Sequence, residues 1–283
     1  MKIILASKYE EAINVPHDAT VEAEYGDRVI EGEKYTLAHH SGKYRGGPAP
    51  CVFPNQQGFD GVTLISHIDL DTIGGCLALY GKKPEDEAFW TGAGFIDVKG
   101  PHHIRELDAA VQAKLQAYSA YSNSLERVKY ETPHDVTENI LAAGKVIAGI
   151  IAGDAYLLRK GEEWRAASEA AVEAKLVYES GYVRAFVTDG VFCSAAYYSK
   201  KQGKVIPAVV VHNQNYNSIT VSFEDGGIRF DASAIVKKMW GDMAGGHAGI
   251  AGSPRGWGLS ADESLNEFNN MVQYIEGIEK MGV

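Results

Sequence analysis

The chain has 283 residues, of which 45% are hydrophobic, so it can bury a sizeable core and is predicted to form two domains. Its formal net charge of −10 argues against a protein that grips long nucleic acid, because such proteins normally present a basic face. The three cysteines form no CxxC pair, which excludes a thiolate zinc knuckle and favours a reducing, cytoplasmic location.

The first 155 residues carry the pattern of an α/β domain. Residues 1–6 and 62–65 are apolar, β-branched runs typical of buried strands, and the first run is too short for a secretory leader. Residues 140–158 form the longest apolar window, but a lysine, an aspartate and three glycines interrupt it. We therefore expect a buried helix there rather than a membrane span, and a doubly wound, mainly parallel sheet over residues 1–155.

The segment after residues 62–65 is polar and reads Ser-His-Ile-Asp-Leu-Asp-Thr-Ile-Gly-Gly. In an extended backbone His67, Asp69 and Asp71 would project from one face, so an imidazole and two carboxylates would converge. This oxygen-rich set suits Mn²⁺ or Mg²⁺, with Zn²⁺ and Co²⁺ as alternatives. Gly74-Gly75 would then let the backbone bend before a helix opens at residue 76. The alternative is a turn that carries two aspartates by chance.

Beyond residue 155 we expect a connecting helix over residues 156–180 and a second α/β domain over residues 181–283. The helix is predicted by apolar residues at helical spacing, namely Trp164, Ala167, Ala171, Ala174 and Tyr178. Strand-like runs follow at residues 183–187, 205–211 and 218–223.

Two helices are predicted near the C-terminus. Asp231 can cap a helix over residues 232–240, and Ser260 with Glu263 forms a capping box before a terminal helix. The buried stripe of that terminal helix is expected to be Leu265, Phe268, Val272 and Ile275.

Residues 245–252, between these helices, read Gly-Gly-His-Ala-Gly-Ile-Ala-Gly. Consecutive glycines let backbone amides approach an anion, and His247 can donate a hydrogen bond to a phosphoryl oxygen. Arg255 can add a fork-like phosphate contact. We therefore expect Gly245, Gly246, His247 and Arg255 to bind a substrate phosphate; a plain glycine-rich turn is the alternative.

Together these motifs resemble those of the DHH phosphoesterase superfamily, which includes RecJ-type exonucleases, small-oligonucleotide ribonucleases and cyclic-dinucleotide phosphodiesterases. Residues 67–75 have the form of its first motif, HxDxDxxGG, and residues 245–252 match the GGHxxAAG of its C-terminal domain except at Ile250. The resemblance covers about half of the chain. It implies a catalytic domain at the N-terminus, a substrate-binding domain at the C-terminus and a two-metal site.

The Asp-His-His motif of that family is missing. The resemblance implies that Asp97, in the strand-like run 94–98, is a bridging carboxylate. One histidine of the pair His102-His103 would then bind the second metal, and the other would protonate the leaving oxygen.

A rearranged domain is the alternative, in which the N-terminal αβ unit supplies His39-His40 and Asp27 is the second-motif carboxylate. For the fourth-motif ligand we assign Asp135, with Asp154 as the alternative. Asp135 can instead be a helix cap, and Asp154 can be an ordinary helix-surface carboxylate.

The predicted function is hydrolysis of short single-stranded oligonucleotides, dinucleotides or a related small phosphoester by a water that two Mn²⁺ ions activate. We expect no binding specific to duplex nucleic acid and no membrane partner. The sequence is compatible with a homodimer. The first alternative is another small-molecule phosphohydrolase. The second is a noncatalytic nucleotide-binding protein with a degenerate site.

Overall fold

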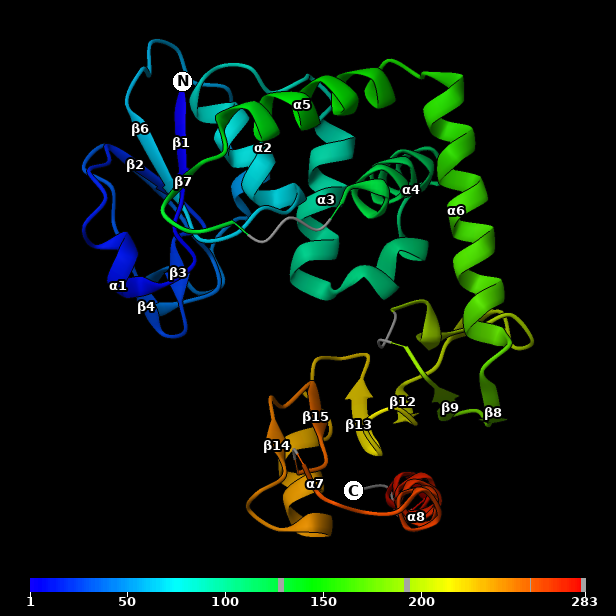
Figure 1. Ribbon diagram of the computed structural model, residues 1–283. Helices are drawn as coiled ribbons and strands as arrows, with labels where there is room; N and C mark the ends of the chain where they lie inside the picture. Colours follow the sequence, from blue (N-terminus) through cyan, green and yellow to red (C-terminus); the bar gives the residue numbers. More distant parts are fainter. Residues whose placement is uncertain (127–129, 191–193, 255, 281–283) are drawn as a thin grey trace. The chain divides into compact units, whose positions relative to one another are not determined.

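The computed structural model describes residues 1–126, 130–190, 194–254 and 256–280 (Figure 1). The chain divides into two compact units: unit 1 comprises residues 1–98 and 104–165, and unit 2 comprises residues 99–103 and 166–283. The main boundary lies inside α6 (Ala155–Glu173), within the segment predicted to connect two domains.

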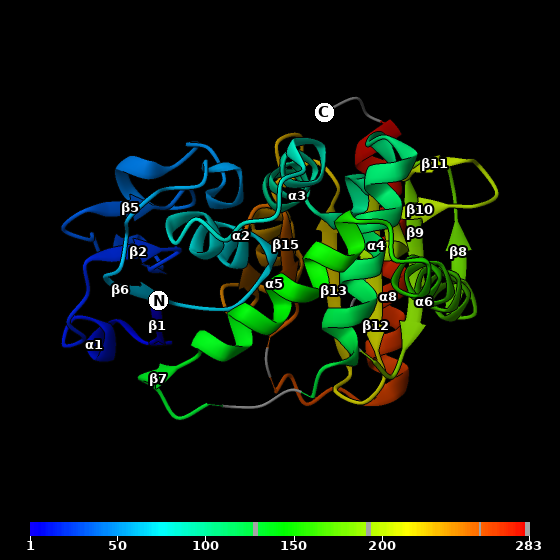
Figure 2. The ribbon, with the colours of Figure 1, turned by 90° about the horizontal axis from the view of Figure 1, so that it is seen from above.

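Unit 1 is built on a five-stranded sheet in the order β5-β2-β6-β1-β7, which the labels in Figure 2 follow. Its strands are β1 (Lys2–Leu5), β2 (Ala19–Val21), β5 (Tyr35–Leu37), β6 (Val62–Ile65) and β7 (His134–Asp135). Neighbouring strands are parallel, except that β7 runs antiparallel to β1 at the edge. The predicted α/β class with a mainly parallel sheet is confirmed, and the runs predicted at residues 1–6 and 62–65 are β1 and β6.

The two faces of this sheet are covered unequally. Ile3, Val21 and Ile65 share the larger core with four helices, which are α2 (Leu70–Leu79), α3 (Glu87–Lys99), α4 (Ala109–Ser124) and α5 (Thr137–Ile151). Leu64 belongs to a smaller cluster formed with α1 (Tyr9–Ala12) and the hairpin of β3 (Glu24–Tyr25) and β4 (Arg28–Val29). Three 3₁₀ turns complete the described elements of this region: η1 (Gly42–Tyr44), η2 (Pro50–Val52) and η3 (Pro101–Glu106).

Three local predictions for unit 1 are wrong. Residues 94–98 belong to α3 rather than to a strand, because Phe89, Trp90 and Ala93 extend their apolar pattern at helical spacing. Gly74 and Gly75 lie inside α2 and do not bend the chain. The apolar window at residues 140–158 spans two helices, because the chain leaves α5 and turns at Gly153, whose φ is 84°.

No single helix in the described ranges is long and apolar enough to cross a membrane. Helices α5 and α6 reach that length and composition only as a pair, and the pair is bent by 96°.

Unit 2 contains a six-stranded sheet in the order β14-β15-β13-β12-β9-β8, in which β12 and β9 are parallel and the other neighbours antiparallel. Its strands are β8 (Leu176–Glu179), β9 (Val183–Thr188), β12 (Ala208–Asn213), β13 (Ser218–Phe223), β14 (Gly245–Gly246) and β15 (Ile250–Gly252). A small separate ladder joins β10 (Tyr198–Ser199) to β11 (Lys204–Val205) after the 3₁₀ turn η4 (Ser194–Tyr197).

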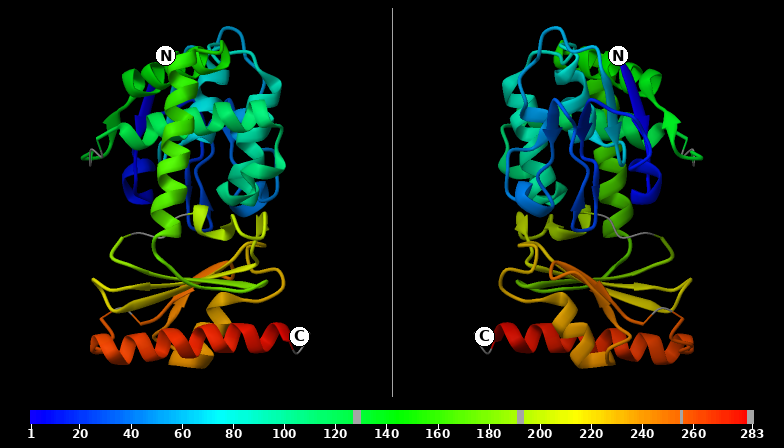
Figure 3. Two further views of the ribbon diagram at one scale, coloured as in Figure 1. Left: turned by 90° about the vertical axis from the view of Figure 1, so that its right-hand side faces the viewer. Right: turned by 90° about the vertical axis from the view of Figure 1, so that its left-hand side faces the viewer.

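Helices α7 (Ala232–Trp240) and α8 (Ala261–Lys280) lie on one face of this sheet (Figure 3) and enclose its main core. The predicted caps are confirmed: the Asp231 carboxylate accepts the N–H of Ala234, and Ser260 and Glu263 bond reciprocally. The strands predicted at residues 183–187 and 218–223 are β9 and β13. Three apolar positions are wrong: Leu265 is 41% exposed, Ala174 follows the end of α6 at Glu173, and Tyr178 lies on β8. The helix predicted over residues 156–180 therefore ends at residue 173.

The glycines of α2 allow close packing. A Cβ atom on Gly74 would lie 2.5 Å from the Cβ of Cys51, whereas one on Gly277 of α8 would have no neighbour within 4 Å. Alanine favours a helix interior over glycine by about 1 kcal/mol, but overpacking a core costs about 1–3 kcal/mol. We therefore expect Gly74→Ala to lower the free energy of unfolding in urea and Gly277→Ala to raise it, as followed by circular dichroism. A stabilising Gly74→Ala would contradict the close contact with η2.

Candidate metal centre

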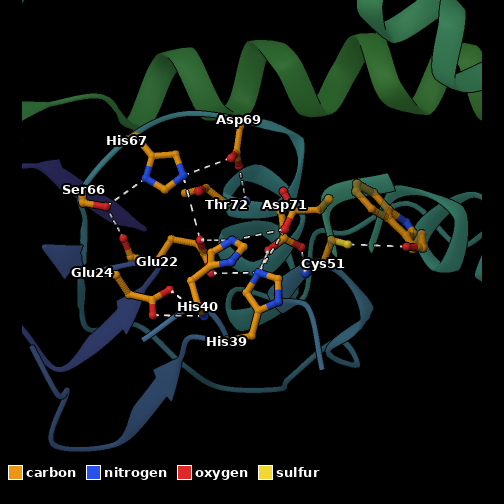
Figure 4. Close-up of polar contacts among 12 residues, drawn as sticks. Glu22, Glu24, His39, His40, Cys51, Ser66, His67, Asp69, Asp71 and Thr72 are labelled. Atoms are coloured by element: carbon orange, nitrogen blue, oxygen red, sulfur yellow. Dashed lines mark hydrogen bonds and ion pairs between the residues drawn. The ribbon is translucent and has the colours of Figure 1, made fainter. Parts of the chain in front are cut away.

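The candidate site lies at the carboxyl ends of three neighbouring parallel strands. Glu22 directly follows β2, His39 and His40 follow β5 after one alanine, and His67 follows β6 after Ser66. Parallel neighbours end at the same edge of a sheet, which is where ligands bind in open α/β sheets. Figure 4 shows these side chains pointing toward one another.

Asp69 and Asp71 reach the site through the start of a helix. Asp69 is the N-cap of α2, where its carboxylate accepts the N–H of Thr72 at 2.8 Å and contacts His67 Nε2 at 3.0 Å. Asp71 is buried in the first turn, and its Oδ1 accepts the N–H of Cys51 at 2.8 Å. The expectation that His67, Asp69 and Asp71 share one face of an extended strand is therefore wrong, because the strand ends at Ile65 and a helix starts at Leu70.

A buried cluster is centred on His39, which is 4% exposed. Its Nε2 lies 3.0 Å from Asp97 Oδ2, 3.4 Å from Asp71 Oδ2 and 3.5 Å from Glu22 Oε1. Each of these four atoms is buried and makes no hydrogen bond within the described residues. Their contacts are ion pairs in which three carboxylates surround one imidazole, and a cation among them would balance the excess negative charge. We call Glu22, His39, Asp71 and Asp97 the buried cluster.

Glu22 joins the buried cluster to the more exposed residues. Its Oε1 faces His39, while its Oε2 lies 3.6 Å from His40 Nε2 and 3.9 Å from His67 Nε2. The carboxylate thus presents one oxygen to each side, as a bridging ligand does. Sequence reasoning missed Glu22, although an acidic residue directly after the apolar run at residues 19–21 repeats the strand-then-polar pattern before His67.

The pKa values of the buried cluster show that it holds protons when no cation is bound. Burial and the charge of Asp71 raise the pKa of Glu22 to about 9. Burial alone would lower the pKa of His39, but contacts with Asp71 and Asp97 and the charge of Glu22 raise it to about 10. Contacts with His39 and His40 lower the pKa of Asp97 despite its burial. A divalent cation must therefore displace protons from this cluster.

The structure groups Asp97 with a different histidine pair from the one preferred from sequence. In the described part of the chain, the residue group around Asp97 that could hold a metal contains His39 and Asp71. His102 and His103 belong to unit 2, where the Nε2 atoms of both contact the carbonyl oxygen of Glu224, at 2.8 and 3.1 Å. The assignment of that pair to the Asp97 site is corrected in favour of the rearranged arrangement with His39-His40.

Three other aspartates have local roles. Asp27 is 95% exposed and pairs with Arg45, so Glu22 occupies the place predicted for it. The Asp135 carboxylate accepts the N–H of Thr137 at the start of α5, and that of Asp154 accepts the N–H of Tyr156 at the start of α6. Neither Asp135 nor Asp154 is in a possible metal-binding group of the described residues, so the assignment of Asp135 as a ligand is corrected to a helix-start contact.

The Gly-Gly-His segment forms a tight hairpin between β14 and β15 at an edge of the unit 2 sheet. The N–H of His247 donates to the carbonyl oxygen of Ile250 at 2.7 Å, so this amide already has a partner. Gly246 has a φ of 154°, and a Cβ there would lie 2.5 Å from that same oxygen. The hairpin thus explains Gly246. Phosphate binding by Gly245, Gly246 and the exposed His247 stays a prediction, and Arg255 lies outside the described residues.

Comparison of the chain with protein-family models finds no match, and comparison with curated proteins finds none either. The resemblance to DHH phosphoesterases therefore stays an expectation from the sequence motifs.

The raised pKa values of Glu22 and His39 predict a pH-dependent metal affinity. Both groups stay protonated until the pH approaches about 9 to 10, and a cation binds the deprotonated forms, so its affinity rises with pH. We expect Mn²⁺ affinity, measured by titration calorimetry, to rise on the order of a hundredfold per pH unit between about pH 6.5 and 8.5, because each bound cation displaces both protons. Buffers of different ionisation enthalpy should report proton release.

Glu22→Gln supplies the control for this experiment, because the amide cannot take up a proton in this range. The pH dependence should become shallower in this variant while binding weakens. An affinity for Mn²⁺ that does not change with pH in the unmodified protein would contradict the expectation.

Proposed function

We propose that the chain is a divalent-metal-dependent phosphoesterase of the DHH type, acting on short oligonucleotides, dinucleotides or a related small phosphoester. The observation that carries the proposal is the convergence of four buried polar atoms that make no hydrogen bond within the described residues. They come from Glu22, His39, Asp71 and Asp97. Three carboxylate oxygens around one imidazole leave an excess of buried negative charge, which a cation at the point they face would balance.

Two cation positions fit the ligands. His39, Asp71 and Asp97 would hold the first. We assign the second to His67 and Asp69, which contact each other at 3.0 Å but belong to no possible metal-binding group of the described residues. Glu22 would contribute to both, because its two oxygens face His39 and His67. Carboxylate oxygens with a minority of imidazole nitrogens suit Mn²⁺, and Mg²⁺, Co²⁺ and Zn²⁺ are the alternatives to test.

Bound divalent cations supply a water of lowered pKa and polarise the phosphoryl oxygen. The chain's own residues orient the ligands: the N–H of Cys51 holds Asp71, and the N–H of Thr72 holds Asp69. His40 has a side chain that is 50% exposed, and its Nε2 lies 3.3 Å from Asp97 Oδ2. As the solvent-reaching imidazole next to the buried cluster, it is assigned the proton transfer to the leaving oxygen.

The order of ligands along the chain supports a rearranged DHH domain. Glu22 and His39-His40 precede the HxDxD segment, yet β5, β2 and β6 lie side by side and bring all of them to one edge. Ala38 stands where the family's motif has aspartate, and Glu22 takes the second carboxylate position. A cytoplasmic location is part of the proposal, because the buried Cys51 and Cys76 are free thiols.

The two rival functions differ in what they require of this site. A noncatalytic nucleotide-binding protein has no need to gather carboxylates and imidazoles at one buried point, so the cluster favours an enzyme. A phosphohydrolase with another small substrate would use the same ligands, and only a substrate panel separates it from the proposed function.

The test is hydrolysis of a panel with Mn²⁺ and with chelator. It contains a 5′-phosphorylated dinucleotide, short RNA and DNA oligomers, a cyclic dinucleotide and a nucleoside monophosphate. We expect Mn²⁺-dependent turnover that falls by at least about a hundredfold in Asp71→Ala, since a direct ligand is lost. The matched control is Asp135→Ala, which removes an exposed carboxylate and should leave kcat unchanged. Nucleotide binding without turnover would instead establish a binding protein.

A further inference from the structure

Unit 1 has a pocket of about 600 Å³ beside the buried cluster. Residues from three segments line it, namely 36–38, 43–50 and 52–54, and we call it the 36–54 pocket. Its volume lies within the roughly 300–1,000 Å³ typical of small-molecule sites. None of the cluster residues lines it, so it is a separate compartment next to the proposed metal centre.

The inner wall of the 36–54 pocket also supports the metal ligands. Ala38 lines the pocket and directly precedes His39. Pro50 lines it as well, and the next residue, Cys51, donates its N–H to Asp71. The pocket wall and the buried cluster are therefore joined through residues that are adjacent in the sequence.

Close contacts hold this wall in place. Cβ atoms on Gly75 of α2 and Gly94 of α3 would lie 2.8 Å from the Cβ of Pro50 and 2.9 Å from that of Ala49. The Lys83 Nζ donates to the carbonyl oxygens of Cys51 and Phe53, at 2.7 and 2.5 Å. The pocket is thus preformed, which lowers the entropic cost of ordering it around a ligand.

The chemistry of the lining favours a flat, uncharged group. Tyr44, Phe53 and three prolines, Pro48, Pro50 and Pro54, line it; the Phe53 ring lies edge-on to Tyr35, and Lys43 Nζ lies 5.2 Å from the centre of the Tyr44 ring. The two cations of the lining are already matched by acids: Lys43 Nζ lies 2.8 Å from Glu31, and Arg45 lies 3.4 Å from Asp27. A second phosphate would therefore meet little unbalanced positive charge here, whereas a planar ring can stack on aromatic faces.

We propose that the 36–54 pocket receives the planar ring of the substrate's organic group, of the nucleobase type, while the phosphate lies at the metal centre. This rests on the proposed function, and it assigns substrate selection to unit 1. Tyr44 is the principal stacking residue, because its ring is partly exposed in the pocket wall and no core cluster includes it.

The test uses the 5′-phosphorylated dinucleotide pApA and two abasic versions of it, each with one base replaced by hydrogen. KM is measured with Mn²⁺ for the unmodified protein and for Tyr44→Ala and Phe53→Leu. Loss of one stacked base should raise KM by about tenfold or more, and Tyr44→Ala should do the same for pApA. KM of the matching abasic substrate should not change in the variants. Tyr156→Ala, on the exposed surface of α6, is the aromatic control.

The outcomes separate the two proposals. Equal KM values for pApA and both abasic substrates would overturn the pocket assignment and leave the phosphoesterase intact. If nothing is hydrolysed, the proposed function fails. Titration calorimetry of the same dinucleotides with Mn²⁺ then decides whether the 36–54 pocket binds a base. An affinity that depends on the base and falls in Tyr44→Ala supports the pocket assignment. An affinity that is unchanged by removing the base, or unchanged by the substitution, overturns it.

Discussion

The rest of unit 1 depends on one constraint, which is that Glu22, His39, Asp71 and Asp97 bring ionisable atoms into a space that excludes water. Burying even one uncompensated charge costs several kcal/mol, so such a group persists only where other interactions outweigh the cost. Here the parallel sheet and the large core beneath it place the strand ends whether or not the site is satisfied. Protons shared between Glu22 and His39 compensate partly, and a divalent cation would do so fully.

The η2 turn connects the structural and the chemical parts of the unit. Helix α2 approaches it through Gly74 and Gly75, and α3 approaches it through Gly94, because each of these contacts leaves no room for a Cβ atom. Lys83 holds its carbonyl oxygens, and the turn in turn holds Asp71. Glycines that read as flexible punctuation are therefore sites of tight packing, and this packing gives both the metal ligands and the 36–54 pocket a rigid support.

Local patterns were read correctly where short-range interactions decide the structure. The strands predicted at residues 1–6 and 62–65, the Asp231 cap and the Ser260–Glu263 capping box each depend on residues a few positions apart. The predictions are wrong where a short segment of sequence is compatible with both a strand and a helix. Residues 94–98 look like a strand but continue a helix, and Asp71 turned out to lie in a helical turn. Asp97 nevertheless belongs to the site, because one turn of α3 places it beside His39.

The sequence by itself determined the α/β class of the first unit and the positions of the caps, because neighbouring residues impose these. Only the tertiary structure placed His39 rather than His102 or His103 beside Asp97, and set the Glu22 carboxylate between His39 and His67. Both histidine pairs follow an apolar stretch and look alike locally. What separates them is the strand order β5-β2-β6, a non-local pairing that no local pattern in the chain encodes.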